Sequence, residues 1–99
     1  MTSQSQQHSI PRFEVYPEEP VYVIGVVSRL VSLPIGTLRA LERRGLVNPK
    51  RMRGRRRLYS LNDLSLLLRI RRLLVDEHMP IKDIRGTLKE EGLLKGVGL

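Results

Sequence analysis

The chain has 99 residues, which is enough for one small domain and too few for two. It contains no cysteine, which excludes disulfides, thiolate metal sites and cysteine nucleophiles, and no apolar run approaches the roughly 18 residues of a membrane span. Eighteen Lys and Arg against ten Asp and Glu give a formal charge of +8. This charge favours a polyanionic partner, which is DNA, RNA or an anionic membrane surface.

Two short helices are expected near the start of the folded part of the chain. Residues 1–20 are polar and proline-rich and predict a flexible tail, and a very short strand is expected over 21–23. Apolar residues at helical spacing from Ile24 predict a helix to about residue 30 or 31. Pro34 suits the start of a second helix, which runs to about Arg44, and Gly45 suits its left-handed cap. Two helices separated by such a short turn indicate a helix-turn-helix.

The helical spacing of apolar residues ends after this helix pair. Residues 47–51 and 56–59 read as extended segments on either side of the turn signal Arg53-Gly54, which predicts a small hairpin, or wing. Ser60 and Asp63 then form a capping-box pattern that opens a helix over about 61–76. A last helix begins near Ile81 and should stop by residue 92, and a flexible tail is expected over 92–99. The expected fold is mainly α with a small β-hairpin: residues 21–91 form one domain, in which a winged helix-turn-helix is followed by two further helices.

The basic residues are concentrated in the second helix and the hairpin. Half of all Lys and Arg lie between Arg39 and Arg57, where Glu42 is the one acid. On a helical wheel, Ile35, Leu38 and Leu41 share one side, which we expect to be buried. Gly36, Ala40 and Arg43 point the opposite way, with Thr37, Arg39 and Arg44 beside them. A helix that presents arginines and small residues can enter a major groove, although the same pattern also fits a merely solvated face.

The hairpin strengthens the nucleic-acid interpretation. Six of the eight residues from Lys50 to Arg57 are basic. Like charges so close together repel each other, which costs stability unless a polyanion neutralises them. A basic wing beside a helix that presents arginines is typical of a protein that grips the phosphates of duplex DNA. The alternative is a disordered basic loop.

Residues 21–90 resemble the DNA-binding domain of the MerR family of bacterial transcription regulators. The segments that carry the resemblance are Tyr22-Val23-Ile24-Gly25, Thr37-Leu38-Arg39, Arg44-Gly45-Leu46-Val47, Arg57-Leu58-Tyr59-Ser60 and Asp63-Leu64. The stretch from Pro20 to Val27 is further similar to the HspR branch of heat-shock repressors, with GlnR-like regulators as near relatives.

The resemblance implies sequence-specific binding of double-stranded DNA at an inverted-repeat operator, by a homodimeric regulator of the repressor type. It implies that the second helix lies in the major groove and the wing on the backbone or minor groove. With the charge pattern, it yields these candidate DNA-binding residues: Gly36, Thr37, Arg39, Ala40, Arg43, Arg44, Arg53, Arg55, Arg56, Arg57 and Tyr59. Such a regulator is expected in the cytoplasm, at the nucleoid, without a membrane partner.

This chain departs from the family pattern in two respects. The family usually carries aromatic residues where this chain has Ala40 and Leu41, so contacts made by those aromatics cannot be transferred. Family members also continue into a long pairing helix, whereas glycines interrupt the last eight residues here. We therefore expect a monomer or weak dimer in free solution that pairs only on DNA. The apolar pair Leu93-Leu94 before Lys95 suggests an Hsp70-type chaperone as a further partner.

Other functional classes have less support. No paired catalytic carboxylates, phosphate-binding glycine loop or metal-ligand cluster emerges, so we expect no enzyme activity, no cofactor and no metal. Two alternatives stay open beside the regulator. One is an architectural or excisionase-like DNA-binding protein, and the other is an RNA-binding or ribosome-associated basic protein.

Overall fold

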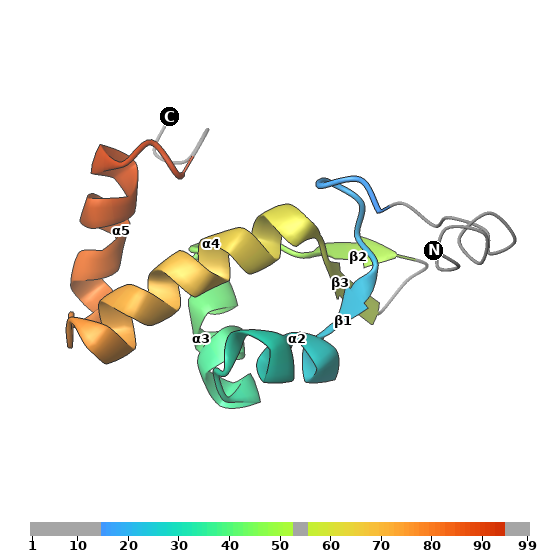
Figure 1. Ribbon diagram of the computed structural model, residues 1–99, viewed down its shortest axis with the longest axis horizontal. Helices are drawn as coiled ribbons and strands as arrows, with labels where there is room; N and C mark the ends of the chain where they lie inside the picture. Colours follow the sequence, from blue (N-terminus) through green and yellow to red (C-terminus); the bar gives the residue numbers. More distant parts are fainter. Residues whose placement is uncertain (1–14, 53–55, 95–99) are drawn as a thin grey trace, which may run out of the picture.

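The computed structural model describes residues 15–52 and 56–94, with side chains given throughout these ranges except at 51, 52 and 56. The elements in chain order are β1 (Tyr22–Val23), α2 (Ile24–Val31), α3 (Ile35–Arg43), β2 (Lys50–Met52), β3 (Arg56–Tyr59), α4 (Leu61–Arg71), the π-helical turn η1 (Arg72–Asp76) and α5 (Ile81–Glu90). The predicted architecture, a helix-turn-helix with a small hairpin and two further helices, is confirmed. Figure 1 shows α4 running from the sheet at one end of the molecule to α5 at the other.

A tight turn joins α2 and α3 and sets their crossing. Ser32 ends α2 in the left-handed conformation with φ 56°. The Ser28 hydroxyl donates to the Leu33 carbonyl oxygen at 2.6 Å, which satisfies a buried acceptor beyond the helix end. Pro34 then precedes α3 as its N-cap. The two helix axes differ in direction by 105°, so α3 stands across α2 as the second helix of a helix-turn-helix.

The end of α3 follows the prediction made for Gly45. This glycine has φ 75°. A residue with a Cβ atom adopts this left-handed conformation only at a cost in free energy. Its N–H donates to the Glu42 carbonyl oxygen at 2.9 Å, and the Leu46 N–H donates to that of Leu41 at 3.0 Å. These two bonds satisfy the last carbonyls of the helix and turn the chain toward the hairpin.

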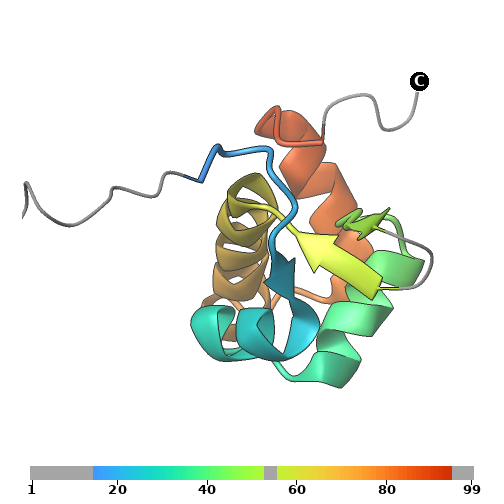
Figure 2. The ribbon, with the colours of Figure 1, turned by 90° about the vertical axis from the view of Figure 1, so that its right-hand side faces the viewer.

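The hairpin belongs to a three-stranded antiparallel sheet with the order β1-β3-β2. Tyr22 pairs with Tyr59 in β1–β3, and Arg51 pairs with Arg57 in β2–β3. The short strand was expected from the sequence, but its partner was not. Because β1 leads directly into α2, this pairing attaches the hairpin to the first helix of the helix-turn-helix. Figure 2 shows α3 and the hairpin on the same side of the molecule.

The core is aliphatic apart from one tyrosine. Its buried residues are Val27, Val31, Leu33, Leu38, Leu41, Leu46, Val47, Tyr59, Leu64, Leu67, Ile70, Leu73, Ile84 and Leu88. One expectation of burial is wrong: Ile35 is 38% exposed, because it occupies the first position of α3. Leu68 in α4 is also exposed, at 51%. The buried stripe runs through residues 64, 67 and 70 of α4 and continues to residue 73 of η1, and Leu68 falls outside it.

The long helix begins as expected and ends differently. The Ser60 hydroxyl accepts from the Asp63 N–H at 3.1 Å, and the Asp63 carboxylate accepts from the Ser60 N–H at 2.9 Å, so the predicted capping box is present. The single helix expected over 61–76 is α-helical only to Arg71, after which η1 continues it in π geometry. Past η1, His78 adopts φ 54° in the turn that leads to α5.

The described segments on either side of the domain are also tied to it. The Asn62 N–H donates to the Pro17 carbonyl oxygen at 2.9 Å, so part of the region expected to be a tail lies against the start of α4. At the other end, Leu94 packs partly buried against the core. Within residues 15–52 and 56–94, no single helix is long and apolar enough to cross a membrane; only the bent pair α2 and α3 together has the length and composition.

Candidate nucleic-acid interface

Helix α3 presents most of its predicted site residues at the surface. Gly36, Arg39, Arg43 and Arg44 are exposed, and Thr37 is half-buried. Ala40 is half-buried as well. The opposite side of the helix is anchored by Leu38 and Leu41, both fully buried. The predicted division of α3 into an apolar side and an arginine-bearing side is therefore present.

The wing residues are described in part. Arg57, in β3, has a side chain that is 41% exposed. Arg53 and Arg55 lie outside the described residues, and for Arg56 only the backbone, in β3, is described. Lys50, which opens β2, is exposed.

An ion pair joins the wing to α3. The Arg57 Nε donates to the Glu42 Oε2 at 2.5 Å, across 15 residues of sequence. Together with Arg39 and Arg43, these two residues line an open hollow of about 390 Å³. Three of the predicted arginines thus line one open concave surface, and arginines are among the residues that contact phosphates and base edges in protein–DNA complexes.

The burial of Tyr59 argues against the contact with DNA that was predicted for this residue. Its side chain is 0% exposed, so the ring belongs to the core and has no surface with which to touch DNA in this conformation. Its hydroxyl has no hydrogen-bond partner among the described residues. Burial raises the pKa of Tyr59, and the carboxylates of Glu42 and Asp63 raise it further. We therefore assign Tyr59 to the core of the domain.

Glu42 lines the hollow, but sequence reasoning gave it no role. Its signal in the sequence is its isolation, since it is the one acid among nine bases between positions 39 and 57. What the sequence could not show is that β3 brings Arg57 back to this carboxylate.

Two arginines outside the predicted site hold the ends of the helix-turn-helix. The Arg71 Nε donates to the Ser32 carbonyl oxygen at 3.4 Å, at the end of α2. An Arg85 guanidinium nitrogen donates to the Arg44 carbonyl oxygen, at the end of α3. Cations at a helix C-terminus also interact favourably with the helix dipole. Helices α4 and α5, which follow the wing, are thus hydrogen-bonded to the C-terminal ends of α2 and α3.

Comparison with known proteins decides the family. Residues 22–91, which include every element from β1 to α5, match the MerR HTH family of regulatory proteins. The chain belongs to this family. A protein named heat shock protein HspR from Streptomyces coelicolor is 39% identical over 79 residues, which are 80% of this chain and 52% of the relative. The transcriptional regulators GlnR of Bacillus anthracis and Bacillus cereus are each 39% identical over 69 residues, 70% of this chain and 53% of theirs.

This MerR-family chain spans about half the length of the curated relatives it matches. The resemblance stated from the motifs is confirmed, including both named branches. The matching family is one of regulatory proteins and the GlnR relatives are named as transcriptional regulators, in agreement with the non-enzymatic function expected from the sequence.

Proposed function

We propose that this MerR-family chain binds double-stranded DNA in a sequence-specific manner, with α3 in the major groove and the wing against the backbone or minor groove. The observation that carries the proposal is the convergence of Arg39, Arg43 and Arg57 around one hollow. Guanidinium groups match both phosphate oxygens and the acceptor edge of guanine. In this proposal Arg39 and Arg43 reach base edges, and Gly36, Thr37 and Ala40 let the backbone of α3 approach the groove.

The other predicted basic residues contact phosphates in this proposal. Arg44 lies at the C-terminal end of α3, and the backbone of Arg56 lies in β3. Arg53 and Arg55 are assigned to phosphate contacts from the sequence alone, because they lie outside the described residues. Contacts with phosphate position a protein on the duplex and provide much of its affinity, but they carry little sequence information. Sequence preference therefore resides in α3.

We further propose that the chain acts as a repressor and binds an inverted repeat as a pair of copies. One copy presents a single α3, and two linked half-sites gain affinity through effective concentration. The repressor role follows from the resemblance of the stretch from Pro20 to Val27 to the HspR branch of heat-shock repressors, and a protein named heat shock protein HspR is similar to this chain. We also propose an Hsp70-type chaperone as a partner, which would contact Leu93 first, because Leu93 is 43% exposed while Leu94 packs partly buried against the core.

Selection from a random library tests the proposed function. The chain is mixed with duplexes that carry 30 random base pairs, bound molecules are amplified over several rounds, and enriched sequences are read. The proposal predicts enrichment of one motif, arranged as an inverted repeat. Binding without enrichment would instead support the architectural or excisionase-like alternative. Preference for a single-stranded or hairpin RNA competitor over the duplex would support the RNA-binding alternative.

A further inference from the structure

We infer that Glu42 is a positioning residue, which holds the Arg57 guanidinium at the edge of the hollow so that its outer nitrogens face a DNA phosphate. The inference rests on the proposed function, and it gives this one acidic residue a role in binding a polyanion. It assigns Glu42 an effect that acts through Arg57 and not through direct contact with DNA.

The charge of Glu42 is the first reason. This carboxylate lines the same hollow as three arginines and is one-fifth exposed. A carboxylate at this place repels phosphate, so on charge alone it lowers the affinity for DNA. A surface that bound DNA by charge alone would bind it more tightly with a neutral residue at position 42. Glu42 must therefore favour binding in another way that offsets its repulsion of phosphate.

The geometry of the ion pair is the second reason. Glu42 accepts from Nε, on the inner edge of the guanidinium, at 2.5 Å. Within the described residues, no protein acceptor is hydrogen-bonded to the two terminal nitrogens of Arg57. The planar guanidinium has five N–H donors, so a contact at Nε leaves four for another acceptor. Glu42 thus holds one edge of the Arg57 guanidinium, and the other edge is left for another acceptor.

The length of the arginine side chain explains why such a hold matters. A free arginine side chain has many rotamers and loses this conformational entropy when it is fixed in one position. If Glu42 fixes Arg57 before DNA arrives, that loss does not weaken the complex. The pair also links the wing to α3 directly, so that a phosphate bound by Arg57 keeps a constant distance from the base pairs under α3.

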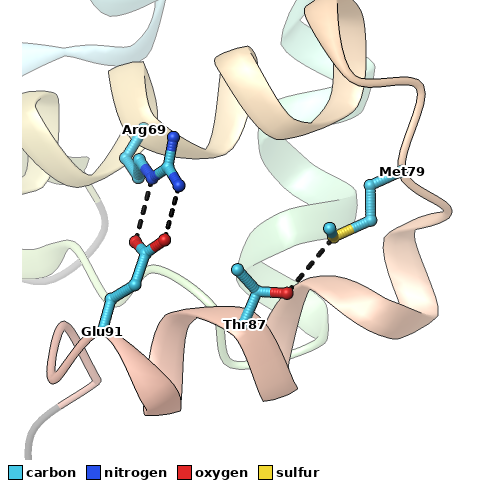
Figure 3. Close-up of polar contacts among 4 residues, drawn as sticks. All are labelled: Arg69, Met79, Thr87 and Glu91. Atoms are coloured by element: carbon cyan, nitrogen blue, oxygen red, sulfur yellow. Dashed lines mark hydrogen bonds and ion pairs between the residues drawn. The ribbon is translucent and has the colours of Figure 1, made fainter.

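A second ion pair of this chain shows the contrasting arrangement. Glu91, just after α5, binds Arg69 of α4 with both oxygens, at 2.9 Å from Nε and 2.5 Å from a terminal nitrogen (Figure 3). Here the acid takes two donors of the guanidinium, Nε and a terminal nitrogen, and links α4 to the end of α5. This pair lines neither the hollow nor the wing, so Glu91→Gln is a matched control for the loss of one ion pair.

Equilibrium binding of four variants tests the inference. Fluorescence anisotropy measures the affinity of the wild-type chain, Glu42→Gln, Arg57→Ala, the double variant and Glu91→Gln for a duplex enriched in the selection above. The titrations are repeated between 50 and 200 mM salt, and thermal melting of each free variant is recorded to separate a loss of folding from a loss of binding.

The expected result is that Glu42→Gln weakens binding by about tenfold, as for the loss of one charge-assisted hydrogen bond. It also lowers the log–log salt slope by about 0.9, the value for one phosphate contact. In the Arg57→Ala background the same change no longer weakens binding, and strengthens it slightly, because only the repulsion is then removed. Glu91→Gln leaves affinity and slope unchanged.

Two results would overturn the inference. One is stronger binding by Glu42→Gln in the wild-type background, which would make the carboxylate simply a repulsive charge. The other is an equal loss with and without Arg57, accompanied by a lower melting temperature, which would make Glu42 a stability residue. If the wild-type chain enriches no duplex, the proposed function fails as well, and that outcome is distinct from both.

Discussion

Ser60 and Asp63 bond to each other twice at the junction where strand β3 becomes helix α4. Each side chain accepts a hydrogen bond from the backbone N–H of the other residue, so two donors at the helix start are satisfied. Because Tyr59 directly precedes Ser60, this junction fixes the end of the wing strand relative to the core. The capping box therefore determines where β3, and with it Arg57, stands relative to the helices.

Replacing Ser60 with Ala should destabilise the domain by about 1 kcal/mol, the usual cost of losing an N-cap side chain. The measurement is urea unfolding followed by circular dichroism. Ser65→Ala, at an exposed position of the same helix, is the control and should change the free energy of unfolding very little. Equal effects of the two substitutions would argue that the cap contributes nothing.

Tyr59→Phe should leave the protein as stable as the wild type or make it more stable. The hydroxyl is buried without a described hydrogen-bond partner, and such a group costs about 1–3 kcal/mol. Because burial raises its pKa above the ordinary 10.0, the folded state binds the phenolic proton more tightly than the unfolded state. The wild-type chain should therefore lose stability as the pH rises above 10, and Tyr59→Phe should lose less. A Phe variant that is markedly less stable at neutral pH would show that the hydroxyl has a partner.

Glu91 should give the chain a component of stability that disappears in acid. The hydrogen bond from Arg69 holds the pKa of Glu91 below its ordinary value of 4.5. A lowered pKa means that the contribution is present above pH 4.5 and is lost as the pH falls below it. Urea unfolding of the wild type and Glu91→Gln from pH 7 to pH 3 should therefore give curves that converge in acid. Parallel curves would mean that the ion pair does not stabilise the fold.

Much of this fold could be predicted from the sequence because its signals are local. The left-handed glycine at Gly45, the capping box at Ser60 and the apolar spacing of α2 each depend on residues within a few positions of one another. The pairing of Tyr22 with Tyr59 depends on residues 37 positions apart in the chain, and local patterns do not report it. The π-helical turn after Arg71 also lacked a signal, because the apolar positions there fit an α-helix equally well.

The candidate site, like the fold, has features that the sequence predicted and others that it did not. The surface position of Arg39 and Arg43 followed from the period of one helix, because Leu38 and Leu41 had to be buried. The burial of Tyr59 and the pairing of Arg57 with Glu42 did not follow, since both arise when β3 packs against elements distant in sequence. Sequence reasoning therefore identified the surface but not the contacts that order it.

We expect the 99-residue chain to be a monomer or a very weak dimer in free solution and to bind an inverted repeat as two copies. Helix α5 ends at Glu90, and Gly92 follows in the left-handed conformation with φ 74°, so the helix does not continue into a pairing segment there. Sedimentation velocity with and without the enriched duplex measures this directly. A tight dimer in the absence of DNA would contradict the expectation.

The affinity of Arg39→Ala for two duplexes, the enriched sequence and a scrambled sequence of the same composition, tests the account most directly. If Arg39 reads base edges from α3, its loss should weaken binding to the enriched duplex by about 1–3 kcal/mol and to the scrambled duplex by much less. Arg69→Ala, on the far helix α4, should bind both duplexes like the wild type. Equal affinities of the wild type and Arg39→Ala for the enriched duplex would contradict the placement of α3 on DNA.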